Sequence, residues 1–169
     1  FHILKSLGKK PGLVKKYYNY LEDEISMLKK NGEVFASKSR NDAIISLINN
    51  NKDVAILDDG FQDFSVLKNL SIVCFNGKQL IGNGLTIPSG PLRETLSSLK
   101  RAHLVVINGN KNSAIETKIF KKNKEIKIFY SKYEPVNIDV LKNKKIVAFA
   151  GIGNPENFFN LLRDYDVNI

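Results

Sequence analysis

Short apolar runs recur along the chain and are separated by polar segments of helical length, and this alternation is the feature that most restricts the fold. The clearest run is Val54 to Leu57, which follows a segment, Asn41 to Asn50, whose apolar residues recur at helical spacing. A run that is apolar at every position is typical of a strand covered by helices on both faces of a parallel sheet. The sequence therefore predicts an α/β fold with a mostly parallel, layered sheet.

The same pattern predicts several further strands. Asn110 to Glu125, by contrast, is polar and rich in lysine, which favours a surface helix or loop. The other predicted strands are Val34 to Ala36, Leu70 to Phe75, Leu104 to Ile107, Ile126 to Phe129 and Ile146 to Ala150.

The N-terminal part is harder to interpret. Leu13 to Lys30 has apolar residues at helical spacing, which predicts one amphipathic helix. Its tyrosines are expected to pack in the core. The residues able to share one face are Tyr17, Tyr20, Leu21, Ile25 and Leu28.

The length of 169 residues fits one domain of ordinary size. Turn-forming residues around Pro135 predict a boundary between two subdomains, residues 1–134 and 135–169. The chain opens on Phe1 and closes on the apolar stretch Val167 to Ile169. We therefore expect it to be an internal fragment of a longer protein.

Charge and cysteine content restrict the partners and the compartment. The net charge of +9 suits an anionic partner, but the combined richness in Lys, Asn and Ile is also typical of AT-rich genomes. The lysines are scattered without aromatic residues between them, so nucleic-acid binding is not expected. The single Cys74 excludes an internal disulfide and favours the cytoplasm. No apolar run has the length of a membrane span.

Two adjacent carboxylates follow the run Val54 to Leu57 and are the sharpest functional feature. Asp58 and Asp59 lead directly into Gly60, at the carboxyl end of a predicted strand, where open α/β sheets bind ligands. Acids in this position suit a Walker B role, in which they hold Mg²⁺ directly or through water. The alternative is a solvated turn in which Asp and Gly only end the strand.

A second constellation is IGNGLTIPSGPLRE, residues 81–94, in which glycines allow close approach and prolines stiffen the loop. Arg93 and Glu94 place opposite charges at the start of a predicted helix. The loop either holds a ligand or is purely structural, with these charges paired to each other or to neighbours.

The third constellation is VAFAGIGNPENFF, residues 147–159, a predicted strand, turn and helix with Asn154 as N-cap. It resembles the start of a dinucleotide-binding fingerprint. Glu156 takes the place of the third glycine, however, and its carboxylate would repel a pyrophosphate, so a nicotinamide cofactor is not expected. Core packing of Phe158 and Phe159 is the simpler interpretation.

Together, DDGFQ, GNGLTIPSGPLRE and AGIGNPENFF, in this order and at these spacings, resemble the tetraacyldisaccharide 4'-kinase family of lipid A biosynthesis. The resemblance covers nearly the whole chain but only about the middle half of a typical member. It implies an incomplete P-loop NTPase fold and a transferase that moves the γ-phosphate of ATP to the 4'-hydroxyl of tetraacyldisaccharide 1-phosphate. It also implies Mg²⁺ and a peripheral place at the cytoplasmic face of the bacterial inner membrane.

The resemblance assigns roles to four acidic residues. Asp58 and Asp59 match the family's paired acids near the metal and phosphates, and Glu94 matches the acid that closes its PLRE motif, also expected at the metal. Asp23 matches the Asp of the family's GDE motif, which implies a base that accepts the hydroxyl proton. Glu22 replaces the usual Gly there, so a flanking acid is an alternative base.

Three further residues match positions associated with the phosphorylated sugar headgroup: Arg40, Gln62 and Arg93. Arginine suits this role because its planar guanidinium binds phosphate with two parallel hydrogen bonds.

The sequence also departs from the family. These residues contain no Walker A loop, G-x-x-x-x-G-K followed by Ser or Thr, and no C-terminal Asp-His region. Asp63 stands where the family usually has His. We therefore expect no kinase activity from this chain alone. Two other hypotheses are a non-catalytic remnant or binding module for a phosphorylated sugar lipid, and an unrelated P-loop-like NTPase that shares only the acidic turn.

Overall fold

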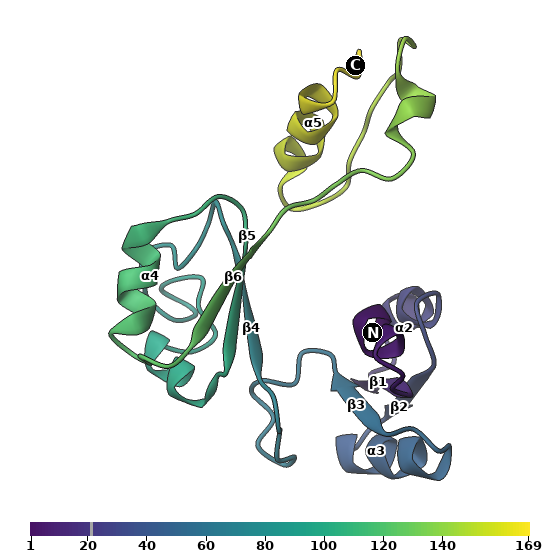
Figure 1. Cartoon of the computed structure of the whole chain (residues 1–169), viewed down its shortest axis with the longest axis vertical. Coiled ribbons are helices and arrows are strands. Elements are labelled where there is room, and N and C mark those ends of the chain that lie inside the picture. The colour runs from purple at the N-terminus through teal and green to yellow at the C-terminus, as the bar shows by residue number, and fades with distance from the viewer. Residues whose placement is uncertain (21) are drawn as a thin grey trace. The chain divides into compact units, whose positions relative to one another are not determined.

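The computed structural model describes residues 1–20 and 22–169, which divide by their internal contacts into two compact units, Phe1–Ile72 and Val73–Ile169. The α/β class is confirmed, because helices alternate with strands along the chain and the strands form two parallel three-stranded sheets (Figure 1). The subdomain boundary predicted at Pro135 stays a prediction.

The sheet of the first unit has the order β2-β1-β3, with β1 (Pro11–Lys16) between β2 (Val34–Ser37) and β3 (Val54–Leu57). Both neighbours run parallel to β1, and Leu13 pairs with Val34 on one side and with Ile56 on the other. The carboxyl ends of the three strands therefore lie at one edge of the sheet, where α/β proteins bind ligands.

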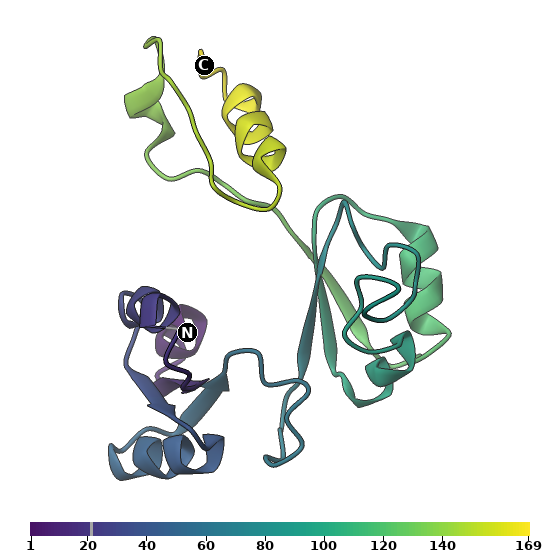
Figure 2. The same cartoon turned by 180° about the vertical axis from the view of Figure 1, so that it is seen from behind.

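Helices cover both faces of this sheet. Figures 1 and 2 show α3 (Arg40–Asn49) along one face and α1 (His2–Ser6) and α2 (Glu22–Lys29) on the other. The core beneath α3 consists of Val14, Phe35, Ala43 and Leu47. Gly12 of β1 permits this packing, because a Cβ atom there would lie 2.7 Å from the Leu47 side chain.

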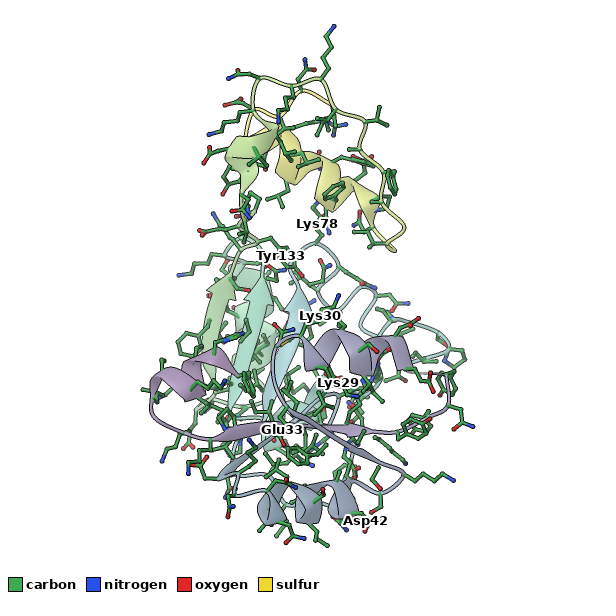
Figure 3. All side chains as sticks on the ribbon, turned by 90° about the vertical axis from the view of Figure 1, so that its right-hand side faces the viewer. Lys29, Lys30, Glu33, Asp42, Lys78 and Tyr133 are labelled. Atoms are coloured by element: carbon green, nitrogen blue, oxygen red, sulfur yellow. The ribbon has the colours of Figure 1, made fainter. Side chains whose placement is uncertain are left out.

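The start of α3 follows the usual chemistry of a helix N-terminus. The hydroxyl of Ser39, the N-cap, accepts a hydrogen bond from the amide of Asp42, at 3.4 Å. The exposed Asp42 side chain projects from the first turn, as Figure 3 shows, where its negative charge complements the helix dipole. These local signals place the first helical residue, Arg40, next to the carboxyl edge of the sheet.

The second unit contains a sheet of order β4-β5-β6, in which β5 (Leu104–Asn108) lies between β4 (Ile72–Asn76) and β6 (Lys127–Ser131). The short helix η1 (Leu96–Arg101) precedes β5, and α4 (Ser113–Phe120) connects β5 to β6. The Lys-rich segment Asn110 to Glu125 therefore contains a helix, as one of its two interpretations predicted. Its inner residues, Ile115 and Ile119, are buried.

The predicted strand Ile146 to Ala150 is not a strand in the structure. The remaining elements there are η2 (Ile138–Leu141) and α5 (Pro155–Asp164). Pairing is limited to a bridge between Lys145 and Asn168, and Val147 and Phe149 are almost fully exposed. The amide of Ile146 donates to the Asn168 carbonyl at 3.1 Å, but among the described residues the rest of the run makes no backbone hydrogen bond to another segment, so no strand forms.

The single helix predicted over Leu13 to Lys30 is also wrong. Its first residues belong to β1, and α2 begins only at Glu22. Tyr20, expected in the core, is exposed and stacks on Tyr18 with ring centroids 5.6 Å apart. Leu21, the other central residue of the predicted face, lies outside the described residues. The helical spacing arose by coincidence, because an apolar strand is followed by a short helix. The first residues form a strand because β1 pairs with a neighbouring strand on each side.

Candidate functional site at the carboxyl edge of the first sheet

The acidic turn begins where β3 ends. Asp58 and Asp59 follow Leu57 directly, and Asp59 adopts the left-handed conformation with φ 51°, which aspartate tolerates better than most residues. Gly60 is buried, and a Cβ atom there would lie 2.6 Å from the Cβ of Leu57. A residue without a side chain is therefore needed for the turn to fold back on its own strand, and the predicted delivery of both acids to this edge is confirmed.

Lys15 of β1 supplies a positive charge beside this turn. Its Nζ donates to Asp58 Oδ2 at 2.5 Å and forms an ion pair with Glu24 Oε2 of α2 at 2.7 Å. The Lys15 side chain is only 9% exposed. Burial alone would lower the pKa of Lys15, but the hydrogen bonds to Asp58 and Glu24 outweigh it and raise this pKa above its usual value. The ammonium group therefore stays charged at neutral pH.

Sequence reasoning missed Lys15. The predicted helix over this segment gave the residue no special place. The signal that could have revealed it is a lysine directly after the apolar pair Leu13 and Val14. In a central parallel strand, a lysine at this position lies near the carboxyl edge and needs an acidic partner if it is buried.

Arg40 binds the same turn from the start of α3. Its Nη2 donates to the carbonyl oxygens of Asp58 and Asp59, at 3.0 and 2.8 Å, and its Nη1 donates to Asp63 Oδ2 at 2.7 Å. The Arg40 side chain is 9% exposed, and its buried Nε has no hydrogen-bond partner in the described part of the chain. The guanidinium thus joins the helix, both carbonyls of the acidic turn and a third carboxylate.

Asp63 is the counter-ion of Arg40. The Ser65 hydroxyl and the Arg40 guanidinium donate to its carboxylate, the former at 2.5 Å, and hold the pKa of Asp63 well below its usual value of 3.8. Asp63 is the position at which the sequence departs from the expected His. The departure supplies a permanent negative charge for the buried arginine.

The other predicted residues of this unit face solvent. Asp23 lies in the first turn of α2 and is exposed, as is Gln62 beyond the acidic turn. Glu24, the neighbour of Asp23, is the acid of this helix that contacts Lys15. The structure therefore brings Asp58, Asp59 and Arg40 together and leaves the roles of Asp23 and Gln62 as predictions.

The predicted loop of residues 81–94 belongs to the second unit and is held by its own backbone. The amide of Ile87 donates to the Leu92 carbonyl and the amide of Gly90 to the Thr86 carbonyl, at 2.9 and 3.0 Å. Glu94 Oε1 accepts from Nη2 of Arg101 in η1 at 2.5 Å. Arg93 beside it is exposed. Glu94 is therefore paired with a neighbouring residue, as the structural interpretation of this loop predicted.

The helix predicted in the third constellation is present as α5, but the interactions predicted for it differ from those observed. Asn154 is the N-cap and Pro155 the first helical residue, yet the Asn154 side chain makes no capping hydrogen bond. Phe158 and Phe159 contact each other, with ring centroids 5.7 Å apart, and are only half-buried.

No group of three or more His, Cys, Asp or Glu side chains within residues 1–20 and 22–169 is arranged to hold a metal ion. Over the same residues, none of the helices combines the length and the apolar character that crossing a bilayer requires.

A parallel sheet with two acids and two buried basic side chains at its carboxyl edge defines an α/β protein of the class that binds its ligand beyond the strand ends. Residues 12–169 match the family model described as Tetraacyldisaccharide-1-P 4'-kinase. The chain belongs to this family.

Curated relatives agree with the family model. The chain is 43% identical to a tetraacyldisaccharide 4'-kinase of Pelagibacter ubique over 92% of this chain and 51% of the relative. It is 38% identical to the Rickettsia bellii protein of that name, over 95% and 50%, and 32% identical to that of Photobacterium profundum, over 97% and 52%. The chain thus spans about half the length of these relatives. No solved structure matches it significantly.

Proposed function

We propose that this chain works as a segment of a tetraacyldisaccharide 4'-kinase. The proposed reaction transfers the γ-phosphoryl group of ATP to the 4'-hydroxyl of tetraacyldisaccharide 1-phosphate, a lipid A precursor, at the cytoplasmic face of the inner membrane. The observation that carries the proposal is the family match over residues 12–169, which includes the acidic turn at the carboxyl edge of the first sheet. The proposed catalytic residues are Asp23, Asp58, Asp59 and Glu94.

In this reaction the 4'-hydroxyl oxygen forms a bond to the γ-phosphorus while the bond from that phosphorus to the ADP oxygen breaks. The hydroxyl proton passes to a base, for which we propose Asp23. Its exposed carboxylate, in the first turn of α2, is accessible to a substrate. Such transfer depends mainly on positioning and on neutralising charge.

The donor set of the turn fits Mg²⁺. This ion prefers oxygen ligands, and it usually takes one or two protein carboxylates and completes its shell with water and phosphate oxygens. Asp58 and Asp59 supply two adjacent carboxylates, and Asp58 is 43% exposed at its side chain. We propose that these two carboxylates hold the ion. When bound, Mg²⁺ would neutralise charge on the phosphates.

The three residues proposed to contact the headgroup differ in how accessible their side chains are. Gln62 and Arg93 are exposed, which suits contact with a phosphorylated sugar. Arg40 is engaged inside the protein by the acidic turn and by Asp63. For Arg40 to bind the headgroup as proposed, the substrate has to displace one of these bonds.

A segment swap tests the proposal. The 169 residues contain no Walker A loop, so we expect the purified chain alone to form no product from labelled ATP and tetraacyldisaccharide 1-phosphate. A chimera in which this chain replaces the matching segment of the Pelagibacter ubique relative should transfer the label. Asp59→Asn in that chimera should lower the rate at least about tenfold.

The result that contradicts the proposal is a chimera that folds, by circular dichroism, and binds ATP yet transfers no label. Unchanged turnover in the Asp59→Asn chimera would remove that residue from the reaction. If the chain alone binds the sugar phosphate tightly and the folded chimera is inactive, the binding-module hypothesis is the better one.

A further inference from the structure

The buried ammonium group of Lys15 occupies the same carboxylate that the proposed function gives to a metal ion. Lys15 Nζ lies 2.5 Å from Asp58 Oδ2 and 2.7 Å from Glu24 Oε2. The inference below rests on the proposed function, because it takes Asp58 as a metal ligand. It concerns what Lys15 and Glu24 do when that metal arrives.

The contact between Lys15 and Asp58 obstructs metal binding for two reasons. The hydrogen bond uses one lone pair of Oδ2, so a cation could bind this oxygen only directly beside the ammonium group. A divalent ion on the other oxygen of the same carboxylate would also lie within a few ångströms of the ammonium charge, and two cations at that distance repel each other strongly.

Glu24 gives the ammonium group a second place to stay. Its carboxylate reaches Lys15 from α2, whereas Asp58 reaches it from the end of β3. Lys15 can therefore leave Asp58 and remain neutralised by one acid without becoming an unpaired buried charge, which would be costly. If Lys15 were paired with Asp58 alone, a metal ion that displaced it would leave an unpaired lysine buried in the protein. That cost would oppose metal binding, and Glu24 removes it.

We propose that Lys15 is a positioning residue that occupies Asp58 in the absence of metal, and that Glu24 retains the ammonium group when a divalent cation displaces it. Lys15 thereby keeps the Asp58 carboxylate oriented, and it sets the metal concentration at which the site fills. Glu24 acts only through Lys15.

The test measures Mn²⁺ binding to the purified chain, by the electron paramagnetic resonance signal of free Mn²⁺. Lys15→Met removes the competing charge and should tighten binding on the order of tenfold. Glu24→Gln leaves Lys15 with Asp58 alone and should weaken binding several-fold. The double variant should bind as Lys15→Met does, because Glu24 has no role without Lys15. Asp58→Asn should abolish the tightening.

Matched controls separate this effect from general charge. Lys16→Met removes the neighbouring lysine of the same strand, whose ammonium lies 5.5 Å from the Tyr18 ring centroid, and Glu22→Gln removes an exposed acid of the same helix. Both should change Mn²⁺ affinity by less than about twofold. Asp58 and Glu24 are 43% and 50% exposed, so water can replace the lost ammonium in Lys15→Met, and circular dichroism checks that this variant folds.

Each outcome decides the proposal. Tighter binding in Lys15→Met, including binding where the parent chain shows none, supports it, provided that Glu24→Gln has no effect in the double variant. Weaker or unchanged binding in Lys15→Met, binding by neither protein, or equal effects of Glu24→Gln with and without Lys15 overturns it. These results are independent of phosphoryl transfer by the chimera, so failure of this inference and failure of the proposed function can be distinguished.

Discussion

Replacing Arg40 by methionine should destabilise the first unit strongly while removing little apolar packing. The substitution keeps most of the aliphatic stem but deletes the group that donates to two carbonyl oxygens and to Asp63. Three hydrogen bonds from a charged donor would sum to about 4.5–9 kcal/mol if each were lost outright.

The exposure of the partners lowers that upper limit. The Asp63 side chain is 18% exposed and keeps its bonds from Ser65, so water and the hydroxyl compensate part of the loss. Breaking a buried ion pair by removing one partner usually costs about 3–5 kcal/mol, and we expect Arg40→Met to fall in this range. Asp63→Asn should cost less, about 1–2 kcal/mol, because Arg40 retains both carbonyl acceptors.

Native-state hydrogen exchange at the amides of β1 and β3 measures the unfolding free energy of this unit. The loss of unfolding free energy in the double variant Arg40→Met and Asp63→Asn should be smaller than the sum of the losses in the two single variants, by about 1–3 kcal/mol. Lys38→Met, at an exposed neighbouring position, should change stability by less than about 0.5 kcal/mol. A cost below about 1 kcal/mol for Arg40→Met, or additive single effects, would refute the reasoning.

Two further predictions concern the same unit. Because Ser65 and Arg40 depress the pKa of Asp63, its carboxylate should stabilise the fold fully above the unfolded pKa near 3.8, and this contribution should decline as the pH falls below that value. The unfolding free energies of the parent and Asp63→Asn should therefore converge in acid, and a constant difference would contradict the assignment. In α3, Leu47→Ala should cost about 2–5 kcal/mol and Ile48→Ala less than about 1 kcal/mol in urea denaturation, because these side chains are 2% and 60% exposed.

The fold class and most strands could be predicted because each depends on a local signal. The run Val54 to Leu57 is apolar at every position and is followed by the acids and glycine that end it, and β3 has these bounds. Ile146 to Ala150 has an equally apolar sequence but no neighbouring strand among the described residues. Strand formation depends on a partner, and a single run carries no information about that partner.

The candidate site, like the fold, could be predicted from the sequence only in part. The two acids of the turn could be found from the strand that precedes them, since strand and turn are contiguous in sequence. Lys15 and Arg40 reach that turn from a neighbouring strand and a helix, at separations of 43 and 18 residues for their contacts with Asp58. Such contacts follow from the order of strands in the sheet, which the apolar pattern does not determine. The family resemblance did assign a role to Arg40, but its internal bonds required the structure.

Arg40 donates to the main-chain carbonyl oxygens of the acidic turn, and these two hydrogen bonds do not involve the aspartate side chains. The bonds from Arg40 to this backbone therefore do not depend on either carboxyl group. Asparagine at these positions keeps the main-chain acceptors of Arg40, although Asp58→Asn also removes the ion pair with the buried Lys15. An inactive Asp59→Asn variant in which these Arg40 bonds persist would therefore have lost its carboxylate and not the hold of Arg40 on the turn.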